Sequence, residues 1–210
     1  MSVKLKFCGL RRKCDISFAN ETKPDYIGFI FAPSKRMISC KEAKELKKDL
    51  NPQIKAVGVF VDCPIEQLAD YDDVADIFQF HGHENEEYIA EVRKRFSDKE
   101  IWKAARLRNF SDIENVAFLD ADKYVLDAFS KAAYGGTGRR IDAQLLEEAV
   151  SILTKPLFIA GGIGSDNISE TIRNIKPYGI DLSSSIETGG FKDLNKMNEI
   201  ITILREENLR

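Results

Sequence analysis

Short apolar runs alternate with amphipathic segments along the whole chain. Each run has the length and apolar composition of a strand, and the segment after it carries apolar residues at helical spacing. The expected strands are residues 1–8, 25–31, 55–61, 76–81, 100–107, 124–126, 156–163 and 178–186. The expected helices are residues 11–22, 40–50, a segment opened by Pro64, 86–96, a weak helix starting near Ser111, 141–150, a helix capped near Ser165 or Asp166, and about 192–206.

This repetition predicts an α/β fold. The 210 residues hold eight strand–helix units, and no linker or low-complexity segment separates them. We therefore expect a (β/α)8 TIM barrel that forms a single domain over residues 1–210, near the short end of the size range of that fold. An open doubly wound sheet is the structural alternative.

Composition and charge narrow the class of protein. The 31 basic residues are interspersed with 34 acidic ones and the net charge is -3, which argues against a nucleic-acid partner. No run approaches the ~18 consecutive apolar residues of a membrane span, and no secretory signal is indicated, so a cytoplasmic location is expected. The four cysteines, which show no CxxC pair, are expected to be free thiols: Cys8, Cys14, Cys40 and Cys63.

The stretch from Tyr124 to Asp142 combines a buried strand, an acid at its end and a glycine-rich turn. Asp127 stands where the strand stops, and the turn that follows leaves a run of backbone N–H groups able to face an anion such as phosphate: Gly135, Gly136, Thr137 and Gly138. A plain connection between strand and helix is the alternative for this stretch alone.

In a barrel of this type, chemistry takes place in the loops after the strands. Polar residues and glycines stand at the ends of the predicted strands or just after them, as this list shows: Cys8, Arg36, His81, Asp127, Gly161, Gly162, and Asp181 to Ser185. Each alone has an ordinary explanation, such as a buried thiol, a turn or a solvated arginine. Their position at one end of the barrel predicts a site there.

The same residues carry a family resemblance. The segments KFCGLRRKCD, GFIFAPSKRMIS, KAVGVFVD, FQFHGHE, IWKAARL, LDAFSKAAYGGTGRRID, FIAGGIGSDNI and GIDLSSSIETGGFKDLNKM, in this order, resemble the phosphoribosylanthranilate isomerases of tryptophan biosynthesis over nearly the whole chain. The resemblance implies a (β/α)8 fold and an Amadori rearrangement that needs no cofactor and no metal. It also implies that Cys8 is the general base and Asp127 the general acid.

The chemistry suits these two residue types. Opening the furanose ring needs a proton on the ring oxygen while an imine forms at C1, and a carboxyl group in a secluded pocket can supply that proton. The resulting cation acidifies the hydrogen at C2, so a thiolate is a sufficient base.

The substrate has two anionic ends, and the resemblance implies a group for each. Arg36 matches the arginine that binds the anthranilate carboxylate, a task suited to a planar guanidinium. Asp181 matches an aspartate near the anthranilate amine, and His81 matches a supporting histidine. The residues matched to the phosphate site are Gly136, Thr137, Gly138, Gly161, Gly162, Ser183 and Ser184. The expected partner is thus a small phosphorylated substrate, and the protein is expected to be a monomer or homodimer.

Three positions depart from the family pattern, and two other functions remain open. The departures are His83, Ile141 and Ser185, of which Ser185 stands beside the expected phosphate loop. Another phosphosugar isomerase or epimerase on the same barrel would use two acids or a metal centre in place of Cys8 and Asp127. A barrel that binds a phosphorylated ligand without catalysis would not need Cys8.

Overall fold

The computed structural model describes residues 2–128 and 143–210. Its parallel strands close into a barrel in the order β1 to β8, and β8 pairs with β1 from Lys4↔Gly179 to Phe7↔Leu182. The eight strands are β1 Lys4–Cys8, β2 Tyr26–Ile30, β3 Lys55–Phe60, β4 Ile77–Phe80, β5 Glu100–Leu107, β6 Lys123–Ala128, β7 Leu157–Ala160 and β8 Gly179–Leu182. Closure confirms the predicted (β/α)8 barrel and excludes the open sheet.

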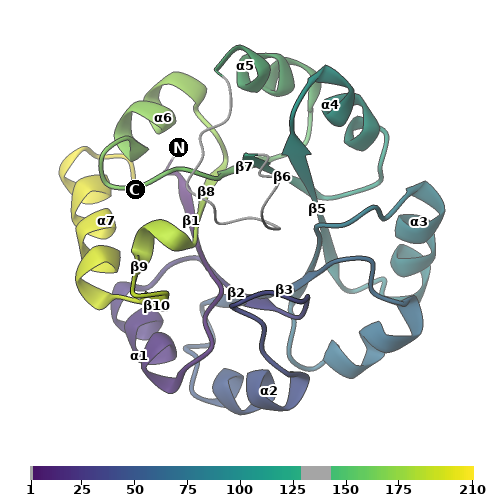
Figure 1. Cartoon of the computed structure of the whole chain (residues 1–210), viewed down its shortest axis with the longest axis horizontal. Helices are drawn as coiled ribbons and strands as arrows, with labels where there is room; N and C mark the ends of the chain where they lie inside the picture. The colour runs from purple at the N-terminus through teal and green to yellow at the C-terminus, as the bar shows by residue number, and fades with distance from the viewer. Residues whose placement is uncertain (1, 129–142) are drawn as a thin grey trace.

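Helices surround the barrel on all sides (Figure 1). They are α1 Lys13–Thr22, α2 Cys40–Lys48, the 3-10 helix η1 Ile65–Tyr71, α3 Glu86–Arg95, α4 Phe110–Ala117, α5 Ala143–Ile152, α6 Ile168–Ile175 and α7 Leu194–Glu206. A short 3-10 helix η2 (Ser184–Ile186) and a hairpin of β9 (Glu187–Thr188) and β10 (Phe191–Lys192) lie between β8 and α7. None of the helices in the described part of the chain has the length and apolarity needed to cross a membrane.

The expected helix opened by Pro64 is present as the 3-10 helix η1. Two other local expectations were wrong. The last strand ends at Leu182, and η2 follows it from Ser184. Helix α6 follows Asn167 at its N-cap position, not Ser165 or Asp166, and the Asn167 side chain accepts a hydrogen bond from the Gly164 N–H. The expectation of free thiols at the four cysteines is confirmed.

Two apolar cores follow from the alternation of side chains along each strand. The outer core packs strand residues such as Leu5 and Phe7 against the helices. The inner core fills the barrel with residues of the opposite face, among them Tyr26, Trp102 and Phe158, whose rings are in contact. Because these rings fill the middle of the barrel, a ligand bound at the barrel axis has to lie above them, at the carboxyl ends of the strands.

Candidate active site

A cavity lies at the carboxyl ends of the strands. The predicted site residues that the structure describes all line it: Cys8, Arg36, His81, Asp127, Gly161, Gly162, Asp181, Ser183 and Ser184. Gly136, Thr137, Gly138 and the departing residue Ile141 lie outside the described residues. The barrel therefore brings together side chains that are far apart in the sequence.

Cys8 is the last residue of β1 and faces the barrel interior. The chain turns immediately after it at Gly9, whose φ of +82° is a backbone conformation that favours glycine. Burial raises the pKa of the Cys8 thiol, although the nearby charges of Lys6 and Lys192 act in the opposite direction. The thiol is thus shielded from water beside the cavity, and the two lysines offset part of the effect of burial on its pKa.

Asp127 and His81 face the cavity from the ends of β6 and β4. Both are largely buried, and His81 Nε2 lies 3.7 Å from Asp127 Oδ2. Burial, together with the positive charges of Arg106, Lys103 and Lys6, lowers the pKa of His81 to about 3. The imidazole is therefore neutral near pH 7, and the contact is not an ion pair.

Asp181 reaches the cavity from β8 and is paired with a fully buried lysine. Its Oδ2 accepts a hydrogen bond of 2.8 Å from Lys6 Nζ, whose β1 position is the direct register partner of Asp181. Within the described residues, Asp181 Oδ1 is buried and has no hydrogen-bond partner. That oxygen is available to a polar group of a ligand.

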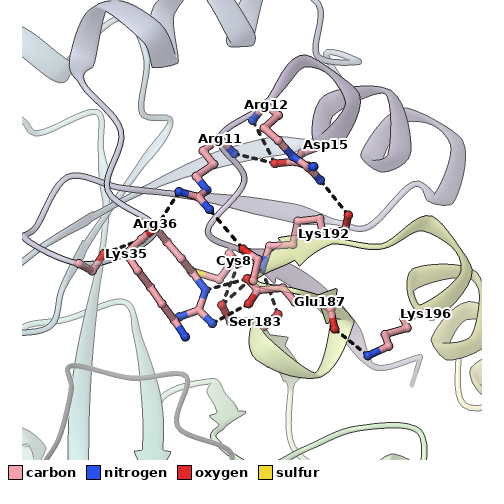
Figure 2. A network of polar contacts seen from close by, with 12 residues as sticks. Cys8, Arg11, Arg12, Asp15, Lys35, Arg36, Ser183, Glu187, Lys192 and Lys196 are labelled. Carbon is pink, nitrogen blue, oxygen red and sulfur yellow. Dashed lines mark hydrogen bonds and ion pairs between the residues drawn. The ribbon is translucent and has the colours of Figure 1, made fainter.

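Arg36 is held by a carboxylate that lies 151 residues away in the sequence. Its Nε and Nη2 donate to Glu187 Oε1 and Oε2 at 2.7 and 2.8 Å, and Lys192 Nζ contacts Glu187 Oε1 at 2.7 Å. Figure 2 shows this cluster next to Cys8, with Lys192 also donating to the Ser183 carbonyl. Two cations share one carboxylate in nearly complete burial, so the cluster retains one positive charge that favours an anionic ligand.

Two of the segments expected to bind phosphate lie after β7 and β8 at the cavity. Gly161 and Gly162 follow β7 with φ of 78° and 65°, a backbone conformation that favours glycine at both positions. Ser183 leads into η2, and its hydroxyl donates to the Cys8 carbonyl at 3.0 Å. Of the departing residues, Ser185 lines the cavity, whereas His83 is exposed and pairs with Asp62 outside it.

The sequence reasoning missed three charged residues of the site: Lys6, Glu187 and Lys192. All three lie in segments that carry the family resemblance: Lys6 in KFCGLRRKCD, and Glu187 and Lys192 in GIDLSSSIETGGFKDLNKM. The resemblance gave no role for any of them. In residues 2–128 and 143–210, no three His, Cys, Asp or Glu side chains are grouped so as to hold a metal ion.

Fold and site together define a (β/α)8-barrel enzyme whose cavity presents a thiol and a carboxyl group to an anionic ligand. Residues 5–202 match the family model of N-(5'-phosphoribosyl)anthranilate (PRA) isomerase. The N-(5'-phosphoribosyl)anthranilate isomerase of Caldanaerobacter subterraneus is 41% identical over 205 residues, which cover 97% of this chain and 98% of that protein. The chain belongs to the N-(5'-phosphoribosyl)anthranilate isomerase family.

Solved structures agree. The phosphoribosyl anthranilate isomerase of Thermus thermophilus superposes with a TM-score of 0.86 at 28% identity, covering 97% of this chain and 99% of that one. A phosphoribosyl anthranilate isomerase in complex with reduced 1-(o-carboxyphenylamino)-1-deoxyribulose 5-phosphate superposes with a TM-score of 0.82 at 28% identity and the same coverage.

Proposed function

We propose that this protein converts N-(5-phosphoribosyl)anthranilate into 1-(2-carboxyphenylamino)-1-deoxyribulose 5-phosphate, a step of L-tryptophan biosynthesis. Membership of the isomerase family supports the reaction. The observation that carries the residue roles is the presence of Cys8 and Asp127 on two separate strands that face one cavity. The proposed enzyme works in the cytoplasm, as a monomer or homodimer, without metal, cofactor, nucleic acid or membrane.

The proposed mechanism divides acid and base between β6 and β1. Asp127 gives a proton to the ring oxygen as the C1–O bond breaks and the nitrogen lone pair forms the C1 imine. The Cys8 thiolate then takes the C2 proton, the electrons of that C–H bond form the C1=C2 double bond of the enolamine, and the π electrons of the C1=N bond return to nitrogen. C1 then takes up a proton while the C2 hydroxyl loses its proton, which gives the ketone. The substrate thus gains two protons and loses two, and proton exchange with solvent returns Cys8 and Asp127 to their starting states.

His81 has a supporting part in this scheme. Its imidazole is neutral near pH 7, lies 3.7 Å from Asp127 Oδ2 and lines the same cavity, so it can help to position that carboxyl group beside the substrate.

The two anionic ends of the substrate have separate binding groups in the proposal. Arg36 takes the anthranilate carboxylate, supported by the positive charge that its cluster retains. The phosphate is bound by Gly161, Gly162, Ser183 and Ser184, together with Gly136, Thr137 and Gly138. Asp181 accepts a hydrogen bond from the anthranilate amine through its unpaired oxygen.

The test is a fluorescence assay for loss of phosphoribosylanthranilate with purified protein, with and without a chelator. We expect turnover in both conditions. Cys8→Ser and Asp127→Asn should each lower kcat by about 10²- to 10⁴-fold and largely spare binding of the reduced product analogue, because proton transfer adds little ground-state affinity. Cys40→Ser, which changes a thiol outside the cavity, is the matched control and should keep normal turnover.

Two results would contradict the proposal. Activity that a chelator abolishes and zinc or magnesium restores would replace the acid–base scheme with a metal-dependent one. Near-normal turnover in Cys8→Ser would rule out a thiolate base, since a serine hydroxyl is a far weaker acid than a thiol.

A further inference from the structure

Lys6 is a fully buried lysine inside the barrel, two residues before Cys8 on β1. Because side chains alternate along a strand, Lys6 and Cys8 point to the same interior face. A buried ammonium group is costly unless other groups compensate its charge. Lys6 Nζ lies 2.8 Å from the Asp181 carboxylate, which compensates its charge, and the Cys8 thiol follows two residues later on the same buried face.

Four charged groups act on the Cys8 thiol from different elements. Lys6 on β1 and Lys192 on β10 favour its thiolate, whereas Asp181 on β8 disfavours it. Arg36, from the segment between β2 and α2, is close enough to interact with it as well. Of these groups, Lys6 has the strongest effect in favour of the ionised form. Lys6 and Asp181 form one ion pair, yet they have opposite effects on the ionisation of the Cys8 thiol: Lys6 favours the thiolate and Asp181 disfavours it.

We propose that Lys6 is a positioning residue whose buried charge, on the same inner face of β1, stabilises the Cys8 thiolate, while Asp181 fixes the Lys6 ammonium and moderates its effect. The inference rests on the proposed role of Cys8 as the base. In the free enzyme the thiol gives its proton to solvent, and during turnover the thiolate takes the C2 proton of the substrate. Lys6 stays protonated throughout, so its contribution is charge and geometry.

The test measures the ionisation of Cys8 without any substrate. In a background of Cys14→Ser, Cys40→Ser and Cys63→Ser, the rate of alkylation by iodoacetamide is followed against pH, because only the thiolate reacts. Lys6→Met should slow alkylation near pH 7 by about tenfold or more and move the profile to higher pH, since it removes a buried opposite charge from the same strand face. Asp181→Asn should do the reverse and speed alkylation.

A matched control separates this role from simple packing. Lys103 is also a buried lysine in an ion pair, with Glu84 at 2.9 Å, but it lies on the outer face of β5. Lys103→Met should lower stability and leave the alkylation profile of Cys8 in place. If Lys6 served only to tie β1 to β8, Lys6→Met would behave in the same way.

The result for either variant, Lys6→Met or Asp181→Asn, can overturn the proposal. A folded Lys6→Met protein with the background profile would do so, and if that variant does not fold, an unchanged profile in Asp181→Asn would do so. Since the measurement needs no turnover, it is independent of the reaction assay. A protein that shows both shifts but does not consume phosphoribosylanthranilate would refute the proposed function and leave the Lys6 inference intact.

Discussion

Gly28→Ala tests whether the position of the Cys8 sulfur sets the rate. Gly28 lies on β2 as the register partner of Cys8, and a Cβ atom at this position would lie 2.6 Å from Cys8 Sγ and 3.2 Å from Cys8 Cα. Nothing in the backbone of Gly28 forbids alanine, because its φ lies outside the left-handed region. The perturbation is therefore steric and is directed at the sulfur.

The size of the effect follows from these distances. Non-bonded atoms of this kind pack at about 3.5–4.0 Å, so the sulfur or the strands must move by about 1 Å. A misplacement of about 1 Å can cost about 10²-fold in rate, which corresponds to about 2.7 kcal/mol of activation free energy. Overpacking also lowers stability, by about 1–3 kcal/mol.

The assay is kcat/KM for phosphoribosylanthranilate together with urea denaturation, and Gly58→Ala is the matched control. Gly58 lies on β3 but faces the outer core, where its Cβ would meet Ala75 Cβ and Phe60 Cε2, both at 2.9 Å. Gly58→Ala should be destabilised to a similar extent and still turn over normally in its folded fraction. If Gly28→Ala kept wild-type kcat/KM, placement of the sulfur would not limit catalysis.

Two further predictions concern the Arg36 cluster. Arg36→Lys keeps the positive charge but loses the planar guanidinium that can form two parallel hydrogen bonds, so KM should rise by about ten- to a hundredfold with a smaller change in kcat. The control His83→Ala, at a position outside the cavity, should change neither KM nor kcat. Wild-type kinetics in a folded Arg36→Lys protein would show that Arg36 does not bind the substrate carboxylate. Burial alone would raise the pKa of Glu187, but hydrogen bonds from Arg36 and the charge of Lys192 lower it to about 2 from an ordinary value of 4.5. Because the folded-state pKa is lowered, the stabilisation by Glu187 is complete above about pH 4.5 and is lost as the pH falls toward 2. Glu187→Gln should therefore be less stable than wild type in urea at pH 7, by about 3 kcal/mol or more, with the difference shrinking at low pH; a difference that is the same at pH 7 and pH 2.5 would contradict this reasoning.

The barrel was predictable because its strands are buried on both faces. Such strands form near-continuous apolar runs, as in DYIGFIF and KAVGVFV, and the helices between them have a different period. Boundaries were less predictable where polar residues follow a strand. The strand expected over 178–186 ends at Leu182, because the serines after it form η2 at the cavity rim and do not continue the barrel ladder.

The site was predictable as far as strand ends alone determine it. Cys8, His81, Asp127 and Asp181 were placed by topology, since the carboxyl ends of all strands in a closed parallel barrel meet at one face. The contact of Arg36 with Glu187 could not be predicted in this way. Arg36 lies in the segment between β2 and α2 and Glu187 lies on β9, so the two side chains are far apart in the sequence and no periodic pattern relates them.

Lys6 shows why an alternating pattern can mislead at such a site. In the sequence KLKFC, lysines alternate with apolar residues, which usually indicates a strand with one face in water. In a closed barrel that polar face turns inward, so Lys6 is completely buried while Leu5 and Phe7 pack beneath the helices. A charged residue on the inner face is stable only where a partner compensates its charge, and Lys6 pairs with Asp181, which lines the ligand cavity together with Cys8. An alternating lysine in a barrel strand that ends in a candidate catalytic residue is therefore better interpreted as part of the site than as a surface residue.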